Sequence, residues 1–430
     1  FEDSMRFRFL KAILIIMICD GACLLMLPAL FHLKYAVFLA IFLIAAGTFW
    51  RHLSLTVFPA FPLGFLALSV ISLVTFAALQ NEGGGISYTS ALFPMMLVGL
   101  SAFIPEDRSH LNFESALDFY QKISVLFVIV HVSWQILFLF SPFAEKGWYD
   151  MANHESLFFA AFGICLSLLL GRWRNTGILA GLVVISLLIR PTSTFIAALA
   201  IGLVITLGFL LNRQAIAMLF GNAVLVLLML FPLAFVAQPK VVEFTYGIEP
   251  MVKEELLGSA SNNSFRIAVL GLAREAILKT PWATGQGFSG TPNVDVGTVN
   301  EGWSGGDPND PLSSRVPIHS DFVIMLWQGG MLGYGLFALS FTAVVVNLRR
   351  SLEIAVAKGA VAAVTLLRSL YIFIVVFSVY ISFNPILQKY SFSYLFWFSL
   401  LILTLACRQT RSWQRQKQAH SLPSGRSHNG

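Results

Sequence analysis

Three arginines and one histidine occupy positions that suit anion binding and proton transfer. Arg190 ends the apolar run 182–189 and precedes the hydroxyl-rich turn 191–194. A charge at the edge of an apolar segment often marks a functional site, although a long side chain reaching towards water would also explain it. Arg266 begins a helical pattern after 261–264, whose residues are good N-cap candidates. A basic residue there opposes the helix dipole, so an anion sharing the site would explain it better than an ordinary solvated arginine does.

His319 lies at the end of a long polar stretch, directly before an apolar segment that starts near Asp321. Histidine exchanges a proton near neutral pH, so it is a natural general base for a hydroxyl nucleophile. Arg315, four residues earlier, would add positive charge to the same place. A purely structural histidine beside a helix cap at Ser320 or Asp321 is the alternative.

The composition requires most of the chain to avoid water. Of 430 residues, 57% are hydrophobic and 12% charged, and the mean hydropathy is +0.76. A soluble domain carries about 25% charged residues. The apolar runs do not alternate as barrel strands do, so the sequence predicts an all-α, polytopic integral membrane protein. The net charge is +6, but the basic residues lie beside the ends of apolar runs, so this charge does not indicate nucleic-acid binding. The four cysteines lack metal or disulfide spacing and are expected to be core residues.

About twelve apolar segments reach or approach membrane-spanning length. They are residues 12–31, 35–50, 55–79, 87–104, 120–140, 155–170, 175–190, 193–211, 215–237, 321–346, 369–386 and 391–407. The chain thus divides into N-terminal transmembrane helices (1–237), a large loop (238–320), C-terminal transmembrane helices (321–407) and a disordered tail (408–430).

Basic residues favour one orientation. With the N-terminus inside, the cytoplasmic connections hold most of the arginines, and the opposite short connections hold few basic residues. The cytoplasmic set is Arg51, Arg108, Arg172, Arg174, Arg213, Arg349, Arg350, Lys358 and Arg368. Both termini are therefore expected in the cytoplasm and the loop 238–320 in the periplasm, with a helix over 264–279 and a turn at 285–287.

This pattern resembles the O-antigen ligase and polysaccharide polymerase superfamily of bacterial inner-membrane glycosyltransferases. The resemblance rests on the twelve helices with one large loop, on Arg190 before its hydroxyl-rich turn, and on Arg266 in a helix that runs into Pro281 and the Gly-Gln-Gly turn. It also rests on His319 before a helix with a glycine-rich turn at 328–333. Members often have Asn where this chain has Ser320.

The resemblance implies glycosyl transfer at the periplasmic face. The donor would be an oligosaccharide on a polyprenyl diphosphate, and the acceptor another glycan or a lipid A core sugar. Arg190, Arg266 and Arg315 would bind the diphosphate, and His319 would deprotonate the acceptor, with inversion at the anomeric carbon. We expect no cofactor and no metal. The partners would be the lipid bilayer and a chain-length regulator protein, with no nucleic acid.

Three activities stay open from the sequence. Polymerisation of O-antigen or exopolysaccharide repeat units is the leading one, partly because of Ser320. Ligation of a finished chain to lipid A core uses the same chemistry with another acceptor. Transport of the lipid-linked glycan would need polar groups along a path through the membrane.

The orientation can be tested by reporter fusions. A fusion at Gly290 should report a periplasmic location, because the basic residues lie on the other side. Fusions at Lys358 and after Cys407 should report the cytoplasm. A cytoplasmic signal at Gly290 would put His319 on the wrong side for a periplasmic reaction.

Overall fold

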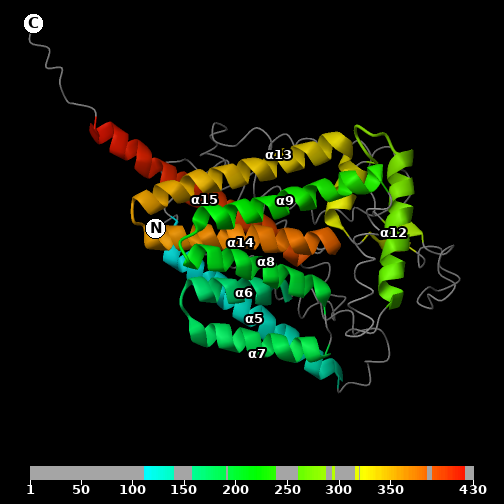
Figure 1. Ribbon diagram of the computed structural model, residues 1–430, viewed down its shortest axis with the longest axis horizontal. Coiled ribbons are helices and arrows are strands. Elements are labelled where there is room, and N and C mark those ends of the chain that lie inside the picture. The colour runs from blue at the N-terminus through cyan, green and yellow to red at the C-terminus, as the bar shows by residue number, and fades with distance from the viewer. Residues whose placement is uncertain are drawn as a thin grey trace, which may run out of the picture.

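The chain folds into a bundle of long helices crossed at one end by a further helix (Figure 1). The computed structural model describes residues 111–139, 157–189, 192–238, 260–286, 293–295, 315–318, 320–384 and 390–421. The first four predicted segments, 12–104, lie outside these residues. The bundle helices are α5 (Phe113–Leu139), α6 (Leu157–Leu169), α7 (Trp173–Ile189), α8 (Ser193–Leu210), α9 (Gln214–Ala237), α13 (Asp321–Ala357), α14 (Val361–Phe383) and α15 (Tyr390–Ser421).

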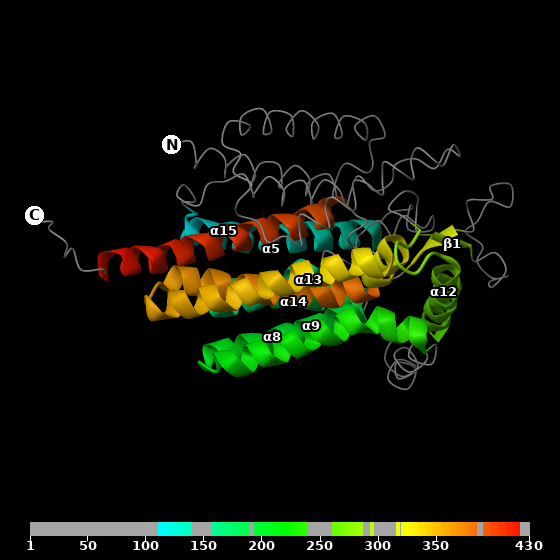
Figure 2. The same cartoon turned by 90° about the horizontal axis from the view of Figure 1, so that it is seen from above.

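One further helix and a two-stranded ribbon complete the described part. Helix α12 (Ala260–Lys279) lies across the end of the bundle in both views (Figures 1 and 2). Strands β1 (Asn293–Asp295) and β2 (Arg315–Pro317) form an antiparallel ribbon, which the sequence did not predict. The predicted loop helix therefore exists, but it begins four residues earlier than expected.

The helices are those of a membrane protein. A helix occupies each predicted segment from residue 120 onwards. Among the described residues, α5, α8, α9, α13 and α14 are long and apolar enough to cross a membrane, while α6 and α7 are shorter. Large apolar side chains remain exposed on the outer helices, as lipid contact requires: Leu188, Leu219 and Leu227 are each at least 68% exposed.

The largest differences from the predicted helix boundaries lie in α13, α14 and α15. Helix α13 continues beyond residue 346 to Ala357, and α14 begins at Val361, which places Arg368 inside a helix rather than in a loop. The predicted disordered tail was wrong as far as Ser421, because α15 continues to that residue. The start of its polar half packs on the bundle: Trp413 meets the ring of Phe113 edge-on at 5.8 Å, and the Lys358 ammonium lies 4.4 Å from the Trp413 ring centroid.

Helix α14 forms the centre of the bundle. It is buried along most of its length, whereas smaller shares of α8 and α9 are buried. Phe158 of α6 meets Phe373 and Phe377 of α14 edge-on, with each pair of centroids 5.1 Å apart. The buried Tyr371 hydroxyl donates towards Met218 O on α9 at 2.8 Å. Aromatic packing thus joins helices that are far apart in the sequence.

Helix α13 is broken at Gly330, where another backbone crosses it. Gly330 has φ +57° and ψ −164°, so it divides α13 into a short head, 321–329, and a long stem, 331–357. The turn after α12 crosses at this break, and Gly285 there has φ +66°. Three backbone hydrogen bonds join the two segments: Gln286 N to Trp327 O (2.8 Å), Met331 N to Trp282 O (3.0 Å) and Leu332 N to Ala283 O (3.0 Å).

The crossing requires glycine, and Gly330→Ala tests this. A methyl group at Gly330 would lie 2.6 Å from both Ala283 C and O, in a backbone conformation that disfavours L side chains. We expect a loss on the order of 3 kcal/mol from the strain and the overlap together. The measurement is the unfolding midpoint of purified protein in detergent.

Two glycines provide matched controls. Gly359 has φ +68° with open space around it, so Gly359→Ala should cost only the backbone strain, about 1–2 kcal/mol. Gly335 in the stem has neither constraint, so Gly335→Ala should not lower the midpoint. Equal midpoints for the Gly330 and Gly359 variants would mean that the close crossing is absent.

Candidate functional site

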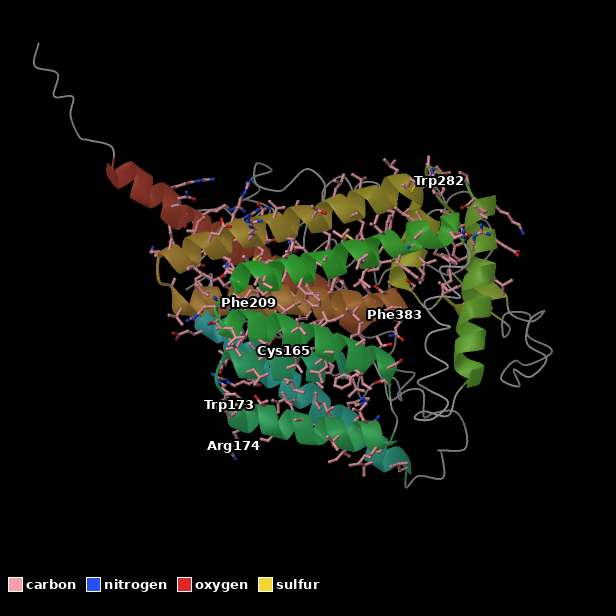
Figure 3. All side chains as sticks on the ribbon, viewed as in Figure 1. Cys165, Trp173, Arg174, Phe209, Trp282 and Phe383 are labelled. Atoms are coloured by element: carbon pink, nitrogen blue, oxygen red, sulfur yellow. The ribbon has the colours of Figure 1, made fainter. Side chains whose placement is uncertain are left out.

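The elements that carry Arg266 and Arg315, and the helix ends that flank Arg190 and His319 in the sequence, lie at one end of the bundle. We call it the loop end and define it by Ile189, Thr192, Ala237, Ser320 and Phe383. Figure 3 shows Trp282 and Phe383 at this end and Trp173 and Arg174 at the other. Because consecutive bundle helices run in opposite directions, the turns 170–172, 211–213 and 358–360 lie together at the opposite end, which we call the basic end.

Helix α12 is fastened to the loop end by its buried face and by one arginine. Val269, Leu270 and Ala273 are fully buried. Arg274 donates from Nε to Val236 O at 3.0 Å, and so satisfies a carbonyl in the last turn of α9. The sequence does not indicate this bond, since periodicity does not show which helix end a long side chain will reach.

The head of α13 is buried throughout. Ser320 caps it, with Oγ accepting from Val323 N at 3.4 Å. Ile318 and Ser320 have no exposed surface, and Asp321 is only 2% exposed. The backbone around this cap is therefore held inside the protein rather than in an open loop. His319 itself lies outside the described residues.

The arginine candidates occupy different elements of the loop end. Arg190 lies outside the described residues, in the short connection between α7 and Thr192. Arg266 belongs to α12, but the helix begins at Ala260, so 261–264 form its first turns and do not cap it. The helix-dipole argument for an anion at Arg266 is correspondingly weaker. Arg315 pairs in register with Asp295 across the ribbon.

Buried polar atoms without a hydrogen-bond partner also occur at the loop end. They are Oε1 of Gln135 near the end of α5, Oγ1 of Thr192 before α8, and Nε1 of Trp327 in the head of α13. Buried polar groups are normally paired, so these three atoms are unusual. The sequence drew attention to Thr192 through the hydroxyl-rich turn 191–194. It gave no such signal for Gln135 and Trp327, because their burial depends on tertiary packing.

A polar stripe along α5 was not recognised from the sequence. Gln121, Ser124, His131 and Gln135 lie on one face of the helix and are all buried. Gln121 donates from Nε2 to Ser167 Oγ at 2.8 Å, and His131 Nε2 lies 3.4 Å from Ser186 Oγ. The spacing of these four polar residues, at three, seven and four positions, places them on one helix face and could have revealed the stripe.

No group of three or more histidine, cysteine and acidic side chains comes together within the described ranges to hold a metal. Cys165 and Cys407 are buried and free, as expected for core residues. Comparison with models of known protein families and with curated protein sequences finds no match to this chain.

Two serines at the interface of α5 and α6 test the stripe. Ser124 Oγ is buried without a partner, so Ser124→Ala should leave the unfolding midpoint unchanged or raise it. Ser167 Oγ accepts from Gln121 and donates to Gly163 O at 2.7 Å. Ser167→Ala should therefore cost about 1–3 kcal/mol, because it leaves the Gln121 amide unpaired.

The two variants are measured side by side in detergent. A clear loss of stability in the Ser124 variant would instead indicate a bound water or ligand at its hydroxyl.

Proposed function

We propose that this chain transfers a glycan from a polyprenyl-diphosphate donor to a sugar hydroxyl at the loop end, and that it thereby polymerises O-antigen or exopolysaccharide repeat units. The observation that carries this proposal is the gathering of α12, the ribbon, the head of α13 and the α7–α8 connection at one end of a membrane-embedded bundle. The sequence resemblance supplies the chemistry.

The distribution of charge supports a periplasmic loop end. Basic side chains of the described residues collect at the basic end, where connections or helix ends carry Arg172, Arg174, Arg213, Arg349, Arg350, Lys358, Arg411 and Arg415. By the positive-inside rule, that end faces the cytoplasm. In a bacterial inner membrane, the loop end then meets the outer leaflet, where a polyprenyl diphosphate displays its glycan.

The reaction divides between the arginines and the histidine. Arg190 and Arg266 bind the diphosphate and offset the charge that develops as the bond from the anomeric carbon to the diphosphate oxygen breaks. His319 accepts the proton of the acceptor hydroxyl, whose oxygen forms the new bond to the anomeric carbon. The polyprenyl diphosphate leaves from the opposite face, so the configuration inverts. Arg315 adds positive charge, with Asp295 as its cross-strand neighbour.

Ligation to lipid A core is the alternative with the same donor chemistry. The two activities differ in the acceptor, so an assay with both acceptors separates them. A transporter is the second alternative, and the α5 stripe is the set of buried polar groups that would bear on it. That stripe is uncharged and is interrupted by the buried Val128, which favours a structural role.

The site is tested by Arg190→Lys, Arg266→Lys and His319→Gln in purified full-length protein in nanodiscs, with a polyprenyl-diphosphate oligosaccharide as donor. Lysine keeps the charge but loses bidentate geometry, so both lysine variants should lose most of their activity. Glutamine can hydrogen-bond but cannot take the proton, so transfer should fall by about 10²- to 10⁴-fold while donor binding persists. Product length is scored on gels.

Arg213→Lys at the basic end is the matched control and should retain full activity. If the Arg190→Lys and Arg266→Lys variants both made near-normal polymer, bidentate binding of the diphosphate by these arginines would be ruled out. Substantial turnover by the glutamine variant would show that His319 only positions the acceptor. Appearance of the donor on the opposite side of the membrane without a new glycosidic bond would establish transport instead.

A further inference from the structure

Three large apolar side chains are exposed where α12 meets α13. Leu278 in the last turn of α12 is 54% exposed, Trp282 in the following turn 55%, and Leu332 just after the break in α13 51%. We call these three residues the boundary patch. Figure 3 shows Trp282 at the rim of the loop end rather than over its centre.

The patch is held in place by main-chain bonds. Met331 N donates to Trp282 O and Leu332 N donates to Ala283 O, each at 3.0 Å. Within the turn, Gly285 N donates to Pro281 O at 2.8 Å. Trp282 and Leu332 therefore belong to one rigid unit formed by the turn and the start of the stem.

The patch continues a lipid-facing stripe along α13. Leu332, Leu339 and Val346 are 51%, 47% and 44% exposed, and their spacing of seven residues puts them on one face of the helix. Helix α13 is long and apolar enough to cross a membrane. An exposed apolar stripe on such a helix faces hydrocarbon, so the boundary patch begins where this lipid contact ends.

The length of the stem places the patch at a membrane boundary. Arg349 and Arg350 are exposed at the basic end, and Arg349 pairs with Glu353 at 3.2 Å in water-accessible positions. From Arg350 to Leu332 an α-helix spans about 27 Å, close to the roughly 30 Å of a bilayer's hydrocarbon core. If the arginines mark one boundary, Leu332 and Trp282 mark the other.

We infer that the boundary patch docks the C-terminal end of α12 onto the phospholipid bilayer, at the layer between headgroups and acyl chains. Tryptophan is the residue type best suited to this layer, because its ring is apolar and its N–H can reach water. Glu275, one turn earlier on α12, is exposed and polar, so the helix leaves the membrane towards its N-terminal end. The inference requires only that α13 spans the membrane.

The experiment is photocrosslinking of the full-length chain in nanodiscs made with phosphatidylethanolamine and phosphatidylglycerol. The photoreactive residue benzoylphenylalanine replaces Trp282, and in separate samples Leu278, Leu332 and, as the matched control, Glu275. Adducts are identified by mass spectrometry. We expect several-fold more lipid adduct at positions 278, 282 and 332 than at 275.

Three outcomes would overturn the inference. Equal lipid adduct at 282 and 275 would mean that the patch is not at the bilayer. A crosslinked dimer of this chain from position 282 would assign the patch to a second copy. Crosslinks to neither lipid nor protein would place the patch in water. Position 332 decides the outcome if the variant at 282 does not elute as a folded monomer, and none of these results depends on glycosyl transfer.

Discussion

The close crossing of two main chains at Gly285 and Gly330 is the constraint on which the loop end depends. Each glycine has a positive φ, and neither leaves room for a side chain. The crossing joins a turn in the long connection to a break in a membrane helix, and it supplies hydrogen-bonding partners to backbone groups that the break would leave unpaired. Irregular backbone near a membrane is tolerated only where protein or water satisfies it. The crossing therefore helps to fix the direction of the head of α13, together with the burial of that head.

The crossing also connects the proposed catalytic residues to the proposed membrane boundary. The same turn carries Trp282, while the head of α13 leads back through the buried Ser320 to the position of His319. The crossing thus links Trp282, which we infer to lie at the bilayer boundary, to the segment that leads to His319, which we propose as the catalytic base. Since Arg274 fastens α12 to the end of α9, the helix that carries Arg266 is held relative to the same junction. Catalytic groups require such support, because small displacements lose much of the rate.

The sequence predicted what depends on composition and periodicity. Membrane helices are long and apolar, so those from residue 120 onwards were located to within a few residues at most ends. The turn at Gly285 was predicted because glycine favours positive φ. Features that depend on packing were missed. Residues 408–421 were predicted to be disordered, because the contacts of Trp413 with Phe113 and Lys358 cannot be read from the local sequence. The ribbon pairs short strands from distant parts of one loop, and no local pattern in Val294 or Val316 specifies that pairing.

The charge distribution of the bundle explains why arginines at the loop end would favour a bound anion. The described side chains at the basic end include exposed carboxylate partners: Asp118 pairs with Arg172 and Lys122, and Glu353 pairs with Arg349. Such exposed pairs contribute little energy, since water screens them. At the loop end, Asp321 is buried in the head of α13 and Asp295 lies opposite Arg315. If Arg190 and Arg266 bind a diphosphate in a site that excludes water, as we propose, the attraction is much stronger than that of the exposed pairs at the basic end.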